Sequence, residues 1–339
     1  MLRRAFLSFL AGVAMLAPSA ATASPALVFE PYNGTVFYSE DPDALWFPAS
    51  LTKLMTAYVT FHALRNGEVT FSTPVVCSKN AAAEPPTKLG LAVGKSITLE
   101  KALRVIIVKS ANDVSVMIAE TVGGSEEAFI DRMNAAAKKL GMTKTQFANP
   151  HGLPNEQQYT TARDLARLAR ALIIEFPEHS EIFAMKSVQV GQKNLRSHNG
   201  LLRTFNGADG MKTGFICDSG FNIVVSATRQ GRKLVAVVLG EPSTRVRNIR
   251  AAQLLENGFK RYFWKSLFGT SLDGLAIQAK LDEQPAHLRQ VICGPRPKKR
   301  RKRRSVRRSS VSPELLGLHY TPVAQASGVP TAATLTAFN

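Results

Sequence analysis

Short apolar runs flank a turn at the start of the chain, and a longer periodic stretch follows them. Leu27 to Phe29 and Val36 to Tyr38 are apolar and lie on either side of Asn33-Gly34, a pair suited to a hairpin turn. From Ser50 to Tyr58 the apolar residues recur at helical spacing. The sequence therefore predicts a β-hairpin and then a helix that has Ser50 near its start.

Helical periodicity dominates the middle of the chain, and strand-like runs return after it. Helices are predicted over residues 99–120, 125–140 and 161–174, strands over 212–216, 221–228 and 233–240, and a final amphipathic helix over 247–264. A turn at Gln230-Gly231 joins the last two strands. This order predicts an α/β (α+β) fold, in which an antiparallel sheet takes its two edges from opposite ends of the chain and carries an inserted helical lobe.

The first 23 residues have the pattern of a secretory signal peptide. Arg3 and Arg4 precede an apolar run from Ala5 to Leu16, and small residues end in Ala21-Thr22-Ala23. A membrane anchor is the alternative, but a spanning helix needs about 20 apolar residues. Arg3-Arg4 also resembles a twin-arginine signal, so two export routes stay open. We expect residues 1–23 to be removed and the protein to reach the periplasm or cell envelope.

The formal net charge of +18 is concentrated near the C-terminus. Residues 296–308 hold ten Lys and Arg and no acid, and without them and Arg3 and Arg4 the charge is +6. A polybasic run can bind nucleic acid, but export separates this chain from such a partner. We therefore expect no nucleic acid and hypothesise that residues 296–308 bind an anionic membrane or envelope surface. Residues 267–295 are interpreted as a linker or short extension, and 309–339 as a disordered tail.

Cysteine and histidine give no strong signal. Cys77, Cys217 and Cys293 can form at most one disulfide, and we expect free buried thiols, with Cys217 a small core residue. His62, His151 and His179 are widely spaced and show no metal-ligand pattern, so structural or surface roles are expected. The sequence predicts neither a metal site nor a cofactor.

Three short motifs carry the candidate chemistry: Ser50-x-x-Lys53, Ser110-Ala111-Asn112 and Lys212-Thr213-Gly214. A Ser and a Lys three residues apart lie on one face of a helix, so the amine can reach the hydroxyl. Lys53 stands in an apolar stretch, and burial or a second cation such as Lys212 would lower its pKa. A neutral Lys53 can then take the proton of Ser50.

With these motifs the chain resembles the D-alanyl-D-alanine carboxypeptidase family, the penicillin-binding serine peptidases related to serine β-lactamases. The resemblance covers about residues 25–266 and rests on four ordered blocks: residues 48–56, 109–113, 147–153 and 209–215. It implies a β-lactamase/transpeptidase-like fold for a catalytic domain over 25–266. It also implies cleavage of peptidoglycan peptides that end in D-Ala-D-Ala through an acyl-enzyme, with β-lactams as acylating inhibitors and a role in cell-wall biogenesis and cell shape.

The resemblance also assigns roles to residues. Ser50 would be the nucleophile, Lys53 its base, and Ser110 a proton relay helped by Lys212. Substrate would be held by a further set: Asn112 at the amide, Thr213 of Lys212-Thr213-Gly214 at the terminal carboxylate, and the backbone N–H groups of Ser50 and Phe215 at the oxyanion.

The cation expected near the terminal carboxylate matches the family at one position and departs from it at another. Arg247 aligns with an arginine that contacts the carboxylate in the family, and an ordinary surface charge is the alternative. His198 stands where some relatives carry a second arginine, and no role is assigned to it. A β-lactamase is the rival enzyme, but the middle motif is Ser-Ala-Asn rather than Ser-Asp-Asn, and no convincing deacylating Glu-containing loop lies between it and Lys212.

Overall fold

A computed structural model of the protein describes residues 24–277 and 284–295. The expected signal peptide (1–23), the basic run (296–308) and the tail (309–339) lie outside the described residues.

The sheet that organises the fold has five antiparallel strands in the order β2-β1-β9-β8-β7. These strands are β1 (Ala26–Phe29), β2 (Val36–Glu40), β7 (Lys212–Ile216), β8 (Gly220–Arg229) and β9 (Arg232–Glu241). Because β1 pairs with β9, the N-terminal hairpin joins the strands from the far end of the chain. The predicted turn between β8 and β9 is present, with positive φ at Gln230 and Gly231. Two edges from opposite chain ends confirm the predicted sheet.

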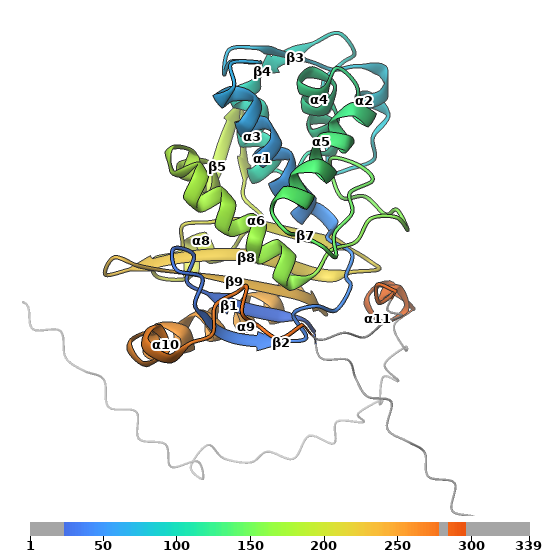
Figure 1. Cartoon of the computed structure of the whole chain (residues 1–339). Coiled ribbons are helices and arrows are strands. Elements are labelled where there is room, and N and C mark those ends of the chain that lie inside the picture. Colours follow the sequence, from blue (N-terminus) through green and yellow to red (C-terminus); the bar gives the residue numbers. More distant parts are fainter. Residues whose placement is uncertain (1–23, 278–283, 296–339) are drawn as a thin grey trace, which may run out of the picture. The chain divides into compact units, whose positions relative to one another are not determined.

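Each face of the sheet packs against a separate apolar core, because successive strand residues point to opposite sides. Leu27 and Phe29 belong to the core shared with the helical lobe, whereas Val28 packs with Leu255 on the other side. The helix α6 (Ala162–Glu175) covers the first face, and α9 (Thr244–Lys260) covers the second (Figure 1). The site described below lies at the β7 edge, beside the lobe.

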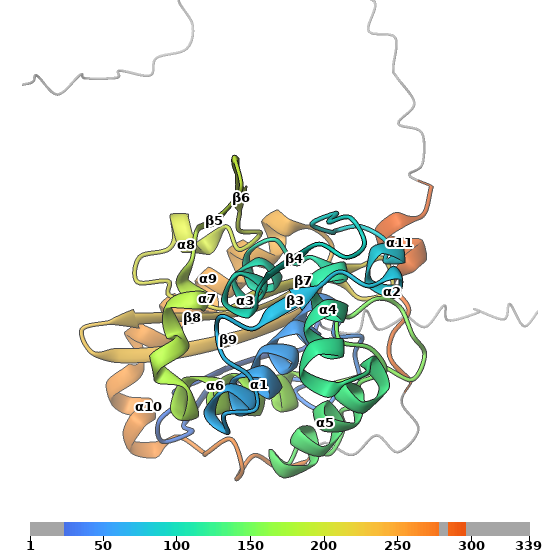
Figure 2. The same cartoon turned by 90° about the horizontal axis from the view of Figure 1, so that it is seen from above.

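The helical lobe is inserted between β2 and β7, as predicted, and its helices lie over the sheet in the view from above (Figure 2). Besides α6, the insertion comprises η1 (Ala49–Leu51), α1 (Thr52–Arg65), β3 (Pro74–Val76), α2 (Lys79–Ala83), β4 (Ser96–Thr98), α3 (Leu99–Val108), α4 (Asn112–Gly123), α5 (Glu126–Lys139), η2 (Pro177–His179), α7 (Ser180–Ala184), β5 (Ser187–Val190), β6 (Lys193–Arg196) and α8 (Leu201–Thr204). Side-chain caps start the two well-predicted helices, since Ser125 Oγ accepts from Ala128 N–H and Thr161 Oγ1 from Asp164 N–H.

Two stretches that were each predicted as one helix form two helices in the structure. The stretch 99–120 breaks into α3 and α4, and Ser110 at the break has φ +63°, which an α-helix cannot contain. The stretch 247–264 is divided at Arg261 into α9, which begins earlier, and α10 (Tyr262–Phe268). Apolar periodicity continues across both breaks, so hydrophobic pattern alone could not place them.

The expectation of free thiols is wrong for two of the three cysteines. Cys217, just after β7, forms a disulfide with Cys293 at the end of α11 (Arg289–Cys293), while Cys77 is free and buried. Arg289 Nη2 also lies 2.6 Å from Asp218 Oδ2. The segment around α11 is therefore fixed to the turn between β7 and β8.

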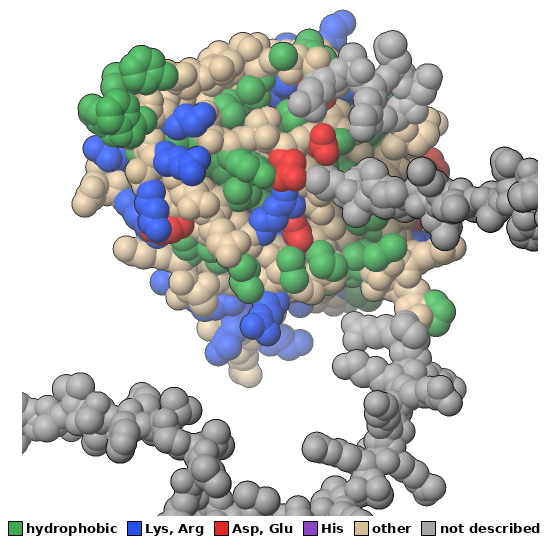
Figure 3. Space-filling view, turned by 90° about the horizontal axis from the view of Figure 1, so that it is seen from below, with side chains coloured by type: hydrophobic (Ala, Val, Ile, Leu, Met, Phe, Trp, Pro, Cys, Tyr) green, Lys and Arg blue, Asp and Glu red, His purple; other side chains and the backbone are tan. Residues whose placement is uncertain are grey.

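Large apolar side chains are exposed on α10. We call Phe263, Trp264, Leu267 and Phe268 the α10 patch; their exposed fractions are 61%, 67%, 60% and 80%. In the space-filling view from below, hydrophobic side chains gather at one corner, with Lys and Arg side chains beside them (Figure 3). Within the described residues, none of the helices combines the length and hydrophobicity needed to cross a bilayer.

Candidate active site

Ser50 lies in the 3-10 turn that leads into α1, and neighbouring strands and loops hold this turn. Asn222 on β8 donates from Nδ2 to the Phe47 carbonyl oxygen at 3.1 Å. Two glycines let other segments approach closely: a Cβ at Gly152 would collide with the Ala49 carbonyl oxygen, and one at Gly214 would lie 2.9 Å from the Pro48 carbonyl oxygen. The serine is thus presented on a turn clamped from two sides.

Lys53, in the first turn of α1, is fully buried, and its Nζ lies 3.1 Å from Ser50 Oγ. Its amine donates to Asn112 Oδ1 at 2.8 Å and to the His151 carbonyl oxygen at 2.5 Å. A neutral amine has two N–H groups and one lone pair. Because the two acceptors take both N–H groups, the lone pair is left for the Ser50 hydroxyl.

Ser110 and Lys212 form a second hydroxyl–amine pair across the same space. Lys212 Nζ, 1% exposed on β7, donates to Ser110 Oγ at 2.9 Å and to the Thr213 carbonyl oxygen at 3.1 Å. The positive φ of Ser110 turns it out of the helical path between α3 and α4. Thr87 Oγ1 donates to the Ser110 carbonyl oxygen at 2.9 Å, which fixes this break from the facing loop.

The electrostatics of the two lysines follow from burial. Burial and the charge of Lys212 hold the pKa of Lys53 well below its ordinary value, although Glu84 and Asp113 oppose this shift. Burial and the nearby Arg247 lower the pKa of Lys212 to about 7. The Lys212 amine is therefore able to exchange protons near neutral pH, and the lowered pKa of Lys53 favours its neutral, basic form.

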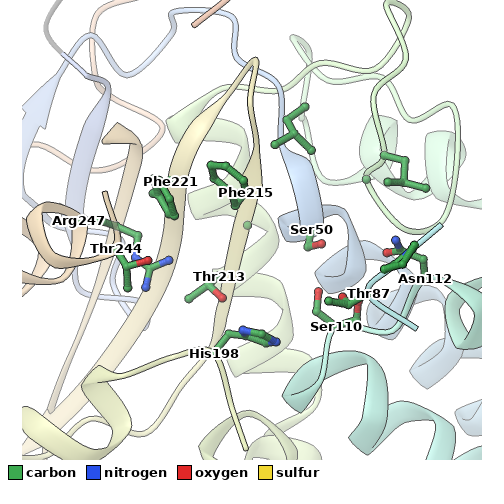
Figure 4. A pocket seen from close by; sticks show the side chains of 15 residues that line it. Ser50, Thr87, Ser110, Asn112, His198, Thr213, Phe215, Phe221, Thr244 and Arg247 are labelled. Atoms are coloured by element: carbon green, nitrogen blue, oxygen red, sulfur yellow. The ribbon is translucent and has the colours of Figure 1, made fainter. Parts of the chain in front are cut away.

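The pairs open into a cavity of about 380 Å³ between β7 and the lobe. Figure 4 shows Ser50, Ser110 and Asn112 on one side and Thr213 across from them. Arg247 also lines the cavity; it is 3% exposed, and burial lowers its pKa to about 10. The alternative that Arg247 is an ordinary surface charge is therefore wrong.

The comparisons with known proteins agree with this geometry. The model of the D-alanyl-D-alanine carboxypeptidase family matches residues 13–243. This chain belongs to that family. The carboxypeptidase DacA of Haemophilus influenzae is 33% identical over 251 residues, 72% of this chain and 64% of its own length. DacC of Escherichia coli is 37% identical over 235 residues, 67% of this chain and 59% of its own. The chain thus spans about 60% of the length of these family members.

Solved structures of penicillin-binding proteins share the fold. Penicillin-binding protein 5 from Haemophilus influenzae has a TM-score of 0.68 and 33% identity, with 72% of this chain and 73% of that chain covered. Penicillin-binding protein D2 from Listeria monocytogenes, in a cefotaxime-bound form, has a TM-score of 0.64 and 29% identity, with 70% and 97% covered. The predicted β-lactamase/transpeptidase-like fold is confirmed.

The structure brings the nine predicted site residues together, although they come from four distant stretches of the sequence. Those that line the cavity are Ser50, Ser110, Asn112, Thr213, Gly214, Phe215 and Arg247, while Lys53 and Lys212 are buried beside it. Sequence reasoning missed the lining residues Thr87 and Thr244 and assigned no role to His198, which also lines the cavity. Thr87 lies in an irregular loop, so no periodic signal pointed to it. Among residues 24–277 and 284–295 there is no cluster of three or more His, Cys, Asp or Glu that could hold a metal ion.

Proposed function

We propose that this chain is a serine-type D-Ala-D-Ala carboxypeptidase that removes the terminal D-alanine from peptidoglycan stem peptides, with residues 25–266 as its catalytic domain. The observation that carries the proposal is the pairing of Ser50 with Lys53 at 3.1 Å and of Ser110 with Lys212 at 2.9 Å in one cavity. Family membership supports the same reaction. The proposed reaction needs no cofactor.

In the acylation step Ser50 Oγ attacks the carbonyl carbon between the two D-alanines. The Lys53 lone pair accepts the hydroxyl proton as the new C–O bond forms. Negative charge develops on the carbonyl oxygen, which the backbone N–H groups of Ser50 and Phe215 stabilise; one such donor contributes about 3–4 kcal/mol in serine hydrolases. The pairing of Lys53 with two acceptors supports this role, because it orients the basic lone pair before substrate arrives.

Departure of D-alanine needs a proton on its nitrogen. Ser110 lies between Lys212 and the cavity, so its hydroxyl can give a proton to the leaving amine and recover one from Lys212. The C–N bond breaks, D-alanine leaves, and Ser50 carries an ester. Water then adds to the ester carbonyl and gives a proton to the Ser110–Lys212 pair, which had given one to D-alanine. The C–O bond to Ser50 breaks, and protonated Lys53 returns its proton to the serine oxygen.

Substrate recognition follows from the polar groups that face the cavity. Thr213 and Arg247 lie on the β7 side and would bind the terminal carboxylate, beside the positive charge of Lys212. Asn112 would hold the substrate amide while its Oδ1 orients Lys53. Gly214 lets β7 pass close to the Ser50 turn, and this close approach supports the proposed role of the Phe215 backbone N–H at the reacting carbonyl.

The reaction is tested by mixing the purified protein with a pentapeptide that ends in D-Ala-D-Ala and measuring released D-alanine. We expect one D-alanine per peptide, and no release from the same peptide ending in D-Ala-L-Ala. Release of a larger fragment, or equal cleavage of both peptides, contradicts the proposal. Penicillins and related β-lactams should acylate the same serine; the structure of a similar protein in a cefotaxime-bound form supports this expectation.

The proposal places the enzyme outside the cytoplasm, in the periplasm or cell envelope, where wall peptides occur. Residues 1–23 would direct export and be removed, and residues 296–308 would bind an anionic membrane or envelope polymer. The sequence of this run, ten basic residues without an acid, supports the second point.

Deleting residues 296–308 should lower the fraction of protein that sediments with anionic membranes at low salt. Each basic residue near such a surface contributes about 1 kcal/mol, and salt screens this attraction. An unchanged sedimented fraction at low salt would contradict the assignment.

A further inference from the structure

Behind Lys53 lies a pair formed by a buried imidazole and a partly buried carboxylate, and these two side chains have no place in the mechanism above. His151 Nε2 lies 3.3 Å from Glu84 Oε2, and the two side chains are 5% and 16% exposed. His151 Nδ1 accepts the backbone N–H of Leu153 at 3.1 Å. Because that nitrogen acts as an acceptor, the neutral imidazole carries its proton on Nε2, facing Glu84.

The pair completes a ring of contacts around the Lys53 amine. Lys53 donates to the His151 carbonyl oxygen and to Asn112 Oδ1. Asn112 Nδ2 in turn donates to the Pro85 carbonyl oxygen at 3.0 Å, next to Glu84 in the chain. Glu84 and His151 then close the ring. Both acceptors that orient the lone pair of Lys53 are thus tied to the loop that follows α2.

The charges around the ring are unequal. The contact with His151 lowers the pKa of Glu84, and Lys53 and Lys88 act in the same direction, so the carboxylate is ionised. Burial lowers the pKa of His151 despite Glu84 and the more distant Glu126. The groups that face Lys53 are Lys212 from β7, Asp113 from α4 and this carboxylate. Glu84 is therefore a negative charge held next to the amine by a neutral imidazole.

We propose that Glu84 and His151 are positioning residues, which hold an acceptor of Lys53 in place and keep a negative charge beside its amine. Neither residue touches substrate. The inference rests on the proposed function, because it assigns the pair to the base of that reaction. Glu84 counteracts part of the effect of burial on Lys53, so it determines where on the pH scale the amine becomes neutral.

The test is the rate of acylation by a fluorescent penicillin across pH, measured on the full chain. Lys53 acts as a base when neutral, so the rate falls as pH decreases. E84Q keeps an acceptor for His151 but removes the charge, which lowers the pKa of Lys53 further and moves this acidic limb to lower pH. E84D keeps the negative charge on a side chain that is one methylene shorter. The acidic limb of its pH profile should stay at the wild-type position, while its maximal acylation rate falls.

Glu126→Gln is the matched control, because Glu126 is a nearby carboxylate that binds Asn80 at the surface. The acidic limb of the pH profile of Glu126→Gln should coincide with that of the wild type. An E84Q limb at the wild-type position overturns the inference, whatever happens to the maximal rate. Absence of labelling of the wild type would instead contradict the proposed function itself, so the two failures are distinguishable.

The α10 patch is a surface feature that is independent of the active site and carries a second inference. Phe263 and Leu267 are four residues apart, as are Trp264 and Phe268, so the patch lies along one side of the helix. On the other side Tyr262 packs against Phe37 with ring centroids 5.3 Å apart. The helix is therefore attached to the sheet by one face, while its most apolar side chains face outward.

The charged residues within α10 and next to it in the sequence are all basic. Lys260, Arg261 and Lys265 lie within or next to α10, and the chain has no acidic residue between Asn257 and Leu272. Exposed aromatic side chains with basic neighbours match an anionic bilayer surface, where aromatic rings occupy the interface and cations meet lipid phosphates. We infer that the α10 patch docks the enzyme on an anionic lipid bilayer.

Trp264 provides a direct readout, because the only other tryptophan, Trp46, is 3% exposed. Phosphatidylglycerol vesicles should shift the emission of the full chain to shorter wavelength, whereas phosphatidylcholine vesicles should not. F263S combined with F268S should lower affinity for the anionic vesicles about tenfold, from the lost apolar contact. Val93→Ser, at another exposed apolar side chain, is the control.

Two outcomes would overturn the docking inference. If vesicles bind the protein but the emission does not change, the contact is made elsewhere, as by residues 296–308. If the emission shifts with protein concentration in the absence of lipid, the patch binds a second copy of the chain instead.

Discussion

Ser50→Ala should eliminate covalent labelling by a fluorescent penicillin and lower the release of D-alanine by about 10³-fold or more. The hydroxyl is the atom that forms the ester, and the neighbouring amine of Lys53 cannot substitute for it at the same position. The small volume removed from the turn before α1 should leave the fold intact. Labelling intensity on a gel and D-alanine release under the same conditions measure the effect.

Ser72→Ala is a suitable control for the Ser50 variant. Ser72 is exposed and contacts Thr70 in a surface turn, away from the cavity. Its labelling should equal that of the wild type. Residual labelling of the Ser50 variant at the wild-type rate would show that another residue is the nucleophile, which would remove the basis of the mechanism.

Lys53→Ala should lower the acylation rate by about 10²–10⁴-fold, the usual contribution of a positioned general base. The variant should also lose the acidic limb of the wild-type pH profile. In the wild type, burial and Lys212 lower the pKa of Lys53, so the neutral base extends to lower pH than for an ordinary lysine and is lost as pH falls further. Stopped-flow labelling from acidic to neutral pH measures both effects.

Two further variants separate loss of the base from loss of the positive charge at Lys53. Lys53→Arg keeps a cation but cannot supply a neutral base, because arginine stays protonated in proteins. It should therefore be as slow as the alanine variant, and rescue by arginine would show that only charge is needed. Lys138→Ala, at an exposed lysine of α5, should have no effect.

Local spacing together with the apolar surroundings of Lys53 predicted its pairing with Ser50, because one helical turn separates the two residues. The convergence of Ser110, Lys212 and Arg247 on that pair followed only from the family resemblance. Ser110 lies at the break before α4, Lys212 on β7 and Arg247 on α9. Their spacing in the sequence does not specify how these elements pack together. The sheet was predictable because period-two patterns and the turn at Gln230-Gly231 are short-range signals.

The features that sequence reasoning missed depend on contacts between distant segments. The Cys217–Cys293 disulfide joins residues 76 positions apart, and composition cannot choose between it and free thiols. The breaks at Ser110 and Arg261 interrupt apolar patterns that look continuous. Glu84 and His151 meet only because two irregular loops pass behind Lys53, so a histidine that looked structural in the sequence lies next to the proposed base.

Peptide mapping by mass spectrometry after reaction with benzylpenicillin tests the central claim most directly. The account predicts one penicilloyl group per protein molecule, on the peptide that contains Ser50 and on its side-chain oxygen. An adduct on a different residue, or unmodified protein under conditions where the fold is intact, would contradict it.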